Sequence, residues 1–156
     1  MSRISAQFRR LGHTRWFARA GRALVPFDRA LGKLTKGRYV AFGMRDVPSL
    51  LITTTGRTSR LPRTNPLLYV PDGDAFVVVG SNWGQDTQPA WALNLIADPQ
   101  AVVTLKGEEL PVRATLATGA ERERLWELLV TMWPAYATYQ ERAGQRDIKV
   151  FRLIRS

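Results

Sequence analysis

Residues 56–63 gather side chains that bind anions. The segment reads Gly-Arg-Thr-Ser-Arg-Leu-Pro-Arg, so three arginines and two hydroxyl side chains fall in one connection between two expected strands. Guanidinium groups and loop amides can grip a phosphate together, because both present N–H donors to its oxygens. The segment has neither the Gly-Lys-Thr/Ser of a Walker loop nor the spaced glycines of a Rossmann turn. Two interpretations remain open, an anion site and a solvated basic turn.

A second set of polar and aromatic residues follows at 81–85 and 89–91, which read Ser-Asn-Trp-Gly-Gln and Pro-Ala-Trp. The proline suits the first turn of a helix, and a helix N-terminus attracts electron-rich groups. Further along, Tyr136 and Tyr139 lie three positions apart. A phenol at the edge of a pocket can donate a hydrogen bond or a proton during a reduction. The alternative for Trp91 and both tyrosines is packing in the core, the commoner role of such residues.

The composition excludes several kinds of chemistry. The chain of 156 residues has no cysteine and one histidine, His13. It therefore cannot use a thiolate nucleophile, a disulfide framework or a zinc site with cysteine ligands, and it lacks the histidines of a polyhistidine site. We expect no bound metal. Because the chain offers so little covalent chemistry of its own, an enzyme of this composition would rely on a cofactor.

From residue 48 onward, short strands alternate with turns. Strands are predicted at 50–55, 66–70, 75–80, 101–105, 110–116 and 148–154, with helices at 89–96 and after the capping-box pair Thr118 and Glu121, and a helix restart at Pro134. Asp72-Gly73 predicts a tight hairpin, so the first three strands are expected to form a meander. Such short connections join antiparallel neighbours. The pattern predicts a mainly β protein with helices (α+β), closed as a six-stranded antiparallel barrel.

Positive charge is concentrated near the N-terminus. The formal net charge is +10. Residues 1–45 carry eleven Lys and Arg against one acid, whereas residues 46–156 carry twelve charges of each sign. This division predicts a basic N-terminal arm at 1–45 and one domain at 46–156 that is large enough to bury a core of its own.

The arm is predicted to form two short amphipathic helices. Gly12 separates the two, and Pro26 is expected to end the second. Apolar residues recur at helical spacing, first at Ile4, Phe8 and Leu11 and then at Trp16, Ala20, Ala23 and Leu24, with Arg15, Arg19 and Arg22 as a basic stripe opposite the second set. Three interpretations remain open: packing on the domain, contact of residues 3–45 with an anionic membrane surface, and nucleic-acid binding, which is favoured least.

The sequence contains no apolar run long enough for a secretory signal or a membrane-spanning helix. We therefore expect a cytoplasmic protein. The membrane interpretation of the arm would place it on the cytoplasmic face of the membrane.

Spaced motifs over residues 48–140 resemble those of a known family. They are Thr-Thr-Thr-Gly-Arg-Thr-Ser at 53–59, then Pro62, Arg63 and Asn-Pro-Leu at 65–67, Asp72-Gly73, Ser81 and Gly84, Pro89, Trp91, Asn94-Leu95, Ala97 and Pro99, and Trp133-Pro134, Tyr136 and Tyr139. In this order they resemble the deazaflavin-dependent nitroreductase family. The resemblance implies a split β-barrel of the FMN-binding type, with reduced coenzyme F420 (8-hydroxy-5-deazaflavin) as hydride donor. The family includes membrane-associated quinone reductases, with which the basic arm is compatible.

Carried over residue by residue, the resemblance implies a cofactor site. Arg57, Thr58, Ser59 and Arg63 would hold the phosphate and lactyl tail of the coenzyme. The residues implied to line the deazaflavin, largely with backbone groups, are Thr64, Asn65, Pro66, Leu67, Leu68, Val79, Gly80, Ser81, Asn82, Ala90, Trp91, Ala92, Leu93 and Asn94. Tyr136 would close over the coenzyme. The candidates for catalytic hydrogen bonds to the acceptor are Tyr136, Tyr139 and Ser81.

Four positions depart from the family pattern. Family members often have Lys where Thr58 stands, Gly where Arg60 and Trp83 stand, and Tyr where Trp133 stands. Arg60 is expected to supply the cofactor-binding charge that Thr58 lacks. Trp83 is expected to narrow the acceptor side, so the departures bear on acceptor preference more than on the cofactor.

The expected activity is hydride transfer from reduced coenzyme F420 to an electron-poor acceptor such as a quinone, a nitroaromatic or an activated enone. The nearest alternative is an FMN-dependent split-barrel oxidoreductase. A third hypothesis, of another class, is a non-enzymatic module that binds anionic lipid or nucleic acid through the arm.

Overall fold

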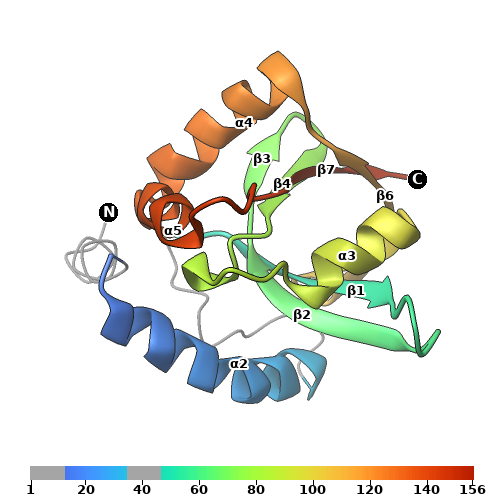
Figure 1. Cartoon of the computed structure of the whole chain (residues 1–156). Helices are drawn as coiled ribbons and strands as arrows, with labels where there is room; N and C mark the ends of the chain where they lie inside the picture. The colour runs from blue at the N-terminus through green and yellow to red at the C-terminus, as the bar shows by residue number, and fades with distance from the viewer. Residues whose placement is uncertain (1–12, 35–46) are drawn as a thin grey trace.

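The computed structural model describes residues 13–34 and 47–156 (Figure 1). The described elements follow the expected alternation of strands and helices after an N-terminal helix. Their bounds are α2 Arg15–Leu34, β1 Ser49–Thr55, β2 Pro62–Leu68, β3 Val70–Asp72, β4 Ala75–Val79, the 3₁₀ turn η1 Asn82–Gly84, α3 Ala90–Ala97, β5 Gln100–Leu105, β6 Glu108–Leu116, α4 Gly119–Met132, α5 Ala135–Ala143 and β7 Val150–Arg155.

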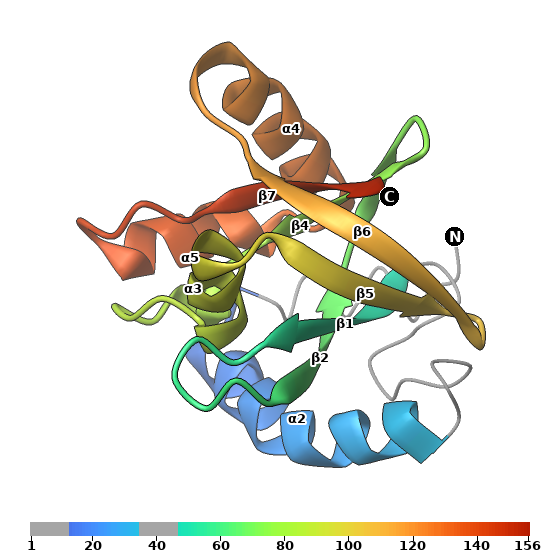
Figure 2. The same ribbon diagram turned by 90° about the vertical axis from the view of Figure 1, so that its right-hand side faces the viewer.

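One antiparallel sheet carries all seven described strands, in the order β2-β1-β5-β6-β7-β4-β3, and it curls around a core (Figure 2). The prediction of six strands in a mainly β, antiparallel α+β barrel is therefore right in class but one strand short. Both edge strands contain proline: Pro62 and Pro66 in β2 and Pro71 in β3. Proline lacks the N–H that a central strand needs, so an edge is where a sheet tolerates it.

The missing strand comes from a division of the segment expected at 66–70. β2 begins earlier, at Pro62. The backbone N–H of Tyr69 still donates to the Pro48 carbonyl at 3.1 Å, one step beyond the Ser49–Leu68 pair, but from Val70 the chain pairs with β4, which makes β3 a separate strand. β2 pairs with β1, and β4 pairs with β3 and β7. The predicted meander of the first three strands is nevertheless confirmed, because the segment expected as one strand at 66–70 pairs with β1 through Pro66, Leu67 and Leu68 and with β4 through Val70.

The hairpin between β3 and β4 turns one residue later than expected. Asp72 pairs with Ala75, so the turn residues are Gly73 and Asp74, with Gly73 at a φ of 60°. The carboxylate of Asp72 accepts hydrogen bonds from Arg124 at 3.0 Å and Arg152 at 2.8 Å. These bonds lower the pKa of Asp72 to about 2 and tie the hairpin to α4 and β7.

The helix α2 is longer than the arm helix that the sequence predicted. It runs from Arg15 to Leu34 with Pro26 inside it, so the predicted stop at Pro26 is wrong. A proline removes one backbone hydrogen bond, and the strong helix formers on both sides of Pro26 keep the neighbouring turns helical. The other predicted arm helix and Gly12 lie outside the described residues.

The sequence predicted the helices of the domain more closely. Pro89 is the last non-helical residue before α3, and Pro134 separates α4 from α5 as expected. Thr118 occupies the residue before α4, but its side chain makes no capping hydrogen bond. The position is therefore confirmed, whereas the expected capping box at Thr118 and Glu121 lacks its hydroxyl half.

Five aromatic side chains, which we call the aromatic junction, join α2 to the domain: Phe17, Trp83, Trp133, Tyr136 and Tyr139. The ring of Phe17 lies 6.5 Å from that of Trp83 and 6.3 Å from that of Trp133, and Phe17 is buried. Edge-to-face and tilted contacts at such distances are favourable for aromatic rings. The packing interpretation of the arm therefore describes the first turns of α2.

Two hydrogen bonds accompany the aromatic contacts between α2 and the domain. The Nδ1 atom of His13 and the Thr138 hydroxyl share a hydrogen bond of 2.6 Å, and the Arg142 guanidinium donates to the His13 carbonyl. Both partners belong to α5, so α2 is held by polar and apolar contacts at one end.

Within residues 13–34 and 47–156, none of the helices has both the length and the apolar character needed to cross a bilayer. The same residues contain no group of three or more His, Asp or Glu placed to hold a metal ion.

Candidate functional site

A pocket of about 320 Å³ lies where the β1–β2 connection meets β2 and the start of α3. Eleven residues from these three places line it: Gly56, Arg57, Thr58, Ser59, Pro62, Arg63, Thr64, Asn65, Ala90, Trp91 and Asn94. We call this the cationic pocket. Its size falls at the lower end of the range for small-molecule sites in proteins.

The shape of the β1–β2 connection follows from its backbone. The N–H of Gly56 donates to the Leu61 carbonyl at 2.8 Å, and the N–H of Arg60 donates to the Gly56 carbonyl at 2.8 Å. A Cβ atom at position 56 would lie 2.5 Å from the Ser59 hydroxyl and 3.1 Å from the Leu61 carbonyl oxygen, so the turn favours glycine there. The tight turn brings the side chains of Arg57 and Arg63 to the same pocket.

Arg57 is bound to α3 through Asn94. The Oδ1 atom of Asn94 accepts the backbone N–H of Arg57 at 3.1 Å and its guanidinium at 3.4 Å. The Nδ2 atom of the buried Asn94 donates to the Thr54 hydroxyl at 3.1 Å. Asn94 therefore joins the end of β1, the connection and α3 into one unit.

Arg63 is oriented by the connection itself. Its guanidinium donates to the Ser59 hydroxyl at 3.3 Å, and the same hydroxyl accepts the backbone N–H of Leu61 at 3.2 Å. On the adjoining strands, the hydroxyls of Thr53 in β1 and Thr64 in β2 share a hydrogen bond of 2.9 Å. Ser59 thus holds a guanidinium that keeps most of its donors available for a ligand.

The electrostatics of the pocket favour an anion. Its lining includes Arg57 and Arg63 but no carboxylate. The ion pairs among the described residues join Arg122 and Lys149 to Asp147, and Arg124 and Arg152 to Asp72, so none neutralises the two pocket arginines. Ala90 and Trp91 add the first two residues of α3, whose backbone N–H groups precede the first hydrogen bonds of the helix, from Ala92 and Leu93 to the Pro89 carbonyl. Of the two open interpretations, this geometry favours the anion site over the solvated turn.

Nine of the residues predicted to bind cofactor lie in this pocket, from Arg57 to Asn65 and at the start of α3. The remaining predicted residues do not line it. Arg60 is exposed on the turn, and Pro66, Leu67 and Leu68 continue along β2. Val79 ends β4, Gly80 and Ser81 follow it, Asn82 begins η1, and Ala92 and Leu93 belong to α3. Their predicted contacts with the deazaflavin stay predictions.

The three predicted catalytic residues do not lie in the pocket either. Tyr136 and Tyr139 are 5% and 1% exposed in the aromatic junction, with their rings 6.2 Å apart. Burial raises the pKa of both phenols, and for Tyr139 a hydrogen bond with the Trp133 side chain acts in the opposite direction. Ser81 is half-buried beside η1. Both tyrosines are thus neutral donors inside the protein, and their catalytic role stays a prediction.

Two pocket residues were absent from the predicted set, namely Gly56 and Pro62. Both are turn formers at the ends of the connection, where the register pairs Thr55 with Pro62. Their signal in the sequence is positional, since a breaker directly after a strand marks the point where the backbone can approach a ligand.

The structure explains two departures from the family pattern. Arg60 and Trp83 have φ angles of 60° and 58°, in the left-handed region where glycine is strained least. The glycine that family members often have at these two positions is therefore explained by the backbone conformation. Trp83 offsets its strain by packing against Phe17 and Tyr139, whereas the Arg60 side chain is exposed. The expected effect of Trp83 on the acceptor stays a prediction.

Comparison with known proteins places these features in one family. The profile of the family described as F420H(2)-dependent quinone reductase matches residues 28–154. An F420H(2)-dependent quinone reductase of Mycobacterium tuberculosis is 33% identical over 146 residues, which cover 91% of this chain and 97% of that protein.

Solved structures agree on the fold. An F420-H2 dependent reductase named FDR-A matches with a TM-score of 0.62 and 36% identity over 68% of this chain and 93% of its own. A heme binding protein from Mycobacterium smegmatis, 20% identical, matches with a TM-score of 0.53 over 70% of this chain and 46% of its own and shares the fold alone. The predicted split-barrel fold is thereby confirmed. Because the family profile spans most of the sequence, the chain belongs to the F420H(2)-dependent quinone reductase family.

Proposed function

We propose that this protein transfers hydride from reduced coenzyme F420 to a quinone and that the cationic pocket holds the phosphate-bearing tail of the coenzyme. The observation that carries the proposal is the pair Arg57 and Arg63, which line one pocket that contains no carboxylate. Residues 46–156 carry equal numbers of positive and negative charges. General attraction by this domain therefore cannot account for anion affinity, and within it specific contacts must supply that affinity.

The residues of the pocket fit an anionic tail. Arg57 and Arg63 would form charge-assisted hydrogen bonds with phosphate oxygens, the hydroxyls of Thr58 and Ser59 add further donors, and the first turn of α3 contributes its N–H groups. When bound, the reduced deazaflavin supplies a hydride. The protein's contribution is to orient the two reactants and to offer hydrogen bonds where negative charge develops on the acceptor.

For that last role we propose Tyr136, Tyr139 and Ser81. The chemistry of these side chains supports the proposal, since a neutral phenol or hydroxyl can donate a hydrogen bond to the oxygen of a reduced quinone. The same donors would serve a nitroaromatic or an activated enone, and these acceptors remain part of the proposal.

The decisive experiment is a titration of the protein with oxidised coenzyme F420, followed by fluorescence quenching. Each charge-assisted bond contributes about 1.5–3 kcal/mol, so Arg63→Ala should raise the Kd by roughly tenfold to over a hundredfold. Arg63→Lys should recover part of the loss, because an ammonium cannot reproduce the two-pronged contact of a guanidinium. Arg113→Ala, which removes an exposed arginine from β6, is the matched control and should leave the Kd within about twofold.

Two outcomes would overturn the assignment. Saturable binding of FMN without binding of the deazaflavin would replace the cofactor by FMN. Equal losses in Arg63→Ala and Arg113→Ala would mean that net charge, and not the pocket, governs affinity. Arg60→Ala in the same series tests whether Arg60 supplies the charge that Thr58 lacks.

We further propose that the outer face of α2 contacts an anionic membrane surface. Trp16 is 70% exposed on α2, next to the buried Phe17, and Arg15, Arg19 and Arg22 are exposed on the same helix. An exposed indole flanked by arginines is the composition of a helix that lies at a lipid interface.

Sedimentation with phosphatidylglycerol vesicles tests the membrane proposal. The double variant Trp16→Ser/Arg19→Gln should lose most of the bound fraction, since it removes an apolar anchor and a charge worth about 1 kcal/mol near such a surface. Arg113→Gln is again the control. Point changes are preferable to deletion of the arm, because deletion would uncover the partners of Phe17. Equal sedimentation of both variants and wild type would contradict the proposal.

A further inference from the structure

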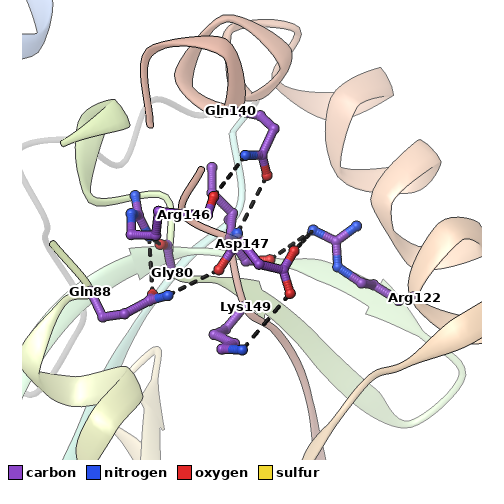
Figure 3. Close-up of polar contacts among 8 residues, drawn as sticks. Gly80, Gln88, Arg122, Gln140, Arg146, Asp147 and Lys149 are labelled. Carbon is purple, nitrogen blue, oxygen red and sulfur yellow. Dashed lines mark hydrogen bonds and ion pairs between the residues drawn. The ribbon is translucent and has the colours of Figure 1, made fainter. Parts of the chain in front are cut away.

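Arg146 lies in the segment between α5 and β7 and binds both ends of the loop 80–88. Its Nε atom donates to the Gln85 carbonyl at 2.8 Å and its Nη2 atom to the Ser81 carbonyl at 2.7 Å. Its Nη1 atom donates to the Gly80 carbonyl at 2.9 Å and to the Gln88 side-chain oxygen at 3.0 Å. Figure 3 shows the guanidinium side by side with Gly80 and Gln88. One side chain thus gathers four acceptors from a single loop.

The segment that carries Arg146 is itself held in place. The Gln140 side chain donates to the Arg146 carbonyl at 2.9 Å and accepts the N–H of Ile148 at 3.3 Å (Figure 3). The Gln88 side chain donates to the Asp147 carbonyl at 2.9 Å. Because α5 supplies Gln140 and the loop supplies Gln88, the guanidinium is braced from both sides and can act as a clamp.

The loop needs such a clamp because its backbone is strained. Asn82, Trp83 and Gly84 follow one another at φ angles of 46°, 58° and 78°. Two of these residues carry side chains, and left-handed backbone at such residues persists only when the surrounding structure holds it. The carbonyls of Ser81 and Gln85, directly before and after the strained residues, are both acceptors of Arg146.

The position of the loop controls the position of the pocket wall. The loop runs into Pro89 and then into Ala90 and Trp91, which line the cationic pocket. The start of the loop packs closely against the residue that follows its end, since a Cβ atom at Gly80 would lie 3.3 Å from the Pro89 ring. A shift of the carbonyls held by Arg146 would therefore move the first turn of α3.

We propose that Arg146 is a positioning residue of the cofactor pocket, which sets the first turn of α3 by clamping the loop 80–88. The inference deepens the proposed function and rests on it for the identity of the ligand. Arg146 does not line the pocket, so it acts through the loop and not by contact with the coenzyme. Burial lowers the pKa of its guanidinium, with Asp86 and Asp147 acting in the opposite direction, and an arginine stays charged in such a site.

The test compares Arg146→Ala with Arg122→Ala. Arg122 is a matched control, because it binds the same segment from α4, through the Ile148 carbonyl at 2.8 Å and the Asp147 carboxylate at 3.2 Å, without touching the loop. Arg146→Ala should raise the Kd for oxidised coenzyme F420 about tenfold, as expected for a group that orients ligand-contacting residues. Arg122→Ala should lower the Tm but keep the Kd within about twofold.

Hydrogen exchange of the backbone amides of residues 81–91 supplies a readout without ligand. Protection there should fall in Arg146→Ala and stay unchanged in Arg122→Ala. Arg146→Lys should show intermediate values, since one ammonium cannot reach four acceptors spread around a guanidinium, and it gives both readouts if the alanine variant does not fold. Unchanged exchange and Kd in a folded Arg146 variant, or equal changes in both arginine variants, would overturn the inference. Absence of coenzyme binding by wild type would instead overturn the proposed function, and the exchange data would still decide whether Arg146 clamps the loop.

Discussion

The cationic pocket and the aromatic junction are built by opposite physical means. In the pocket, arginines without carboxylate neighbours are presented by a tight turn and a helix start. In the junction, five aromatic residues from three separate parts of the chain pack against one another, and four of them are buried. The loop 80–88 belongs to both, since Trp83 packs in the junction and Pro89 leads into the wall of the pocket.

This contrast indicates a division of labour. A phosphate or carboxylate is a constant feature of a coenzyme, so a local, charged and preformed grip suits it. Acceptors of varied shape are better met by packed apolar surface, whose few polar groups decide orientation. If this interpretation is right, changes in one region should leave the function of the other largely intact.

The largest effect is expected from the phenols of the junction. The double variant Tyr136→Phe/Tyr139→Phe should lower turnover with a quinone by roughly tenfold to a thousandfold while coenzyme binding persists, because it removes polar contacts made in the transition state. Steady-state kinetics with a quinone, a nitroaromatic and an enone measure it. Tyr69→Phe, which changes a partly buried tyrosine packed on Phe76, is the control. Turnover equal to wild type with all three acceptors would reduce the pair to packing residues.

The next effect concerns the stability of the junction. Phe17→Ala should lower the free energy of unfolding by about 3 kcal/mol, because it leaves a cavity between Trp83 and Trp133. Trp16→Ala, one position away and exposed, should change it by less than about 0.5 kcal/mol. Urea unfolding gives both values. A tenfold rise in the Kd for coenzyme in Phe17→Ala would show that the two regions are not independent.

The smallest effect compares two residues with the same backbone conformation. Arg60→Gly should raise stability by about 0.5 kcal/mol, because relief of left-handed strain exceeds the entropic cost of glycine by a small margin. Trp83→Gly relieves the same strain but should be net destabilising by about 2–3 kcal/mol, since it removes a ring from the junction. Thermal unfolding of both variants measures the two changes in stability. A stabilised Trp83→Gly would mean that the junction contributes little to folding.

Part of the pocket was predictable from local signals. The segment 56–63 carries its charges, its glycine and its proline within one connection, and a helix start after Pro89 follows from the proline. Hairpin pairing and the broad class of the fold were predictable for the same reason, since turn residues and strand patterns act over short distances. Thr64, Asn65 and Asn94 were implied by the family resemblance and not by a local signal.

The missed features depend on distant contacts. No local pattern tells that the strand expected at 66–70 changes partner at Tyr69, because that change depends on where β1 and β4 lie in the curled sheet. The helix α2 continues through Pro26 against its local preference. The role of Arg146 was not predicted, because its acceptors include backbone carbonyl groups about sixty residues earlier in the chain. Every residue has a backbone carbonyl, so the sequence does not mark which of them accept a hydrogen bond.

The prolines of the two outer strands affect how this protein associates with itself at high concentration. β2 and β3 are the two ends of the strand order and are joined through Tyr69, and each of these strands contains proline. A strand from another chain that approached either side would find a ladder interrupted at Pro66 or Pro71, which weakens the template for intermolecular sheet growth. Self-association of this protein is therefore expected to use side-chain surfaces and to remain reversible, and prolonged storage at high concentration should yield little amyloid-like aggregate.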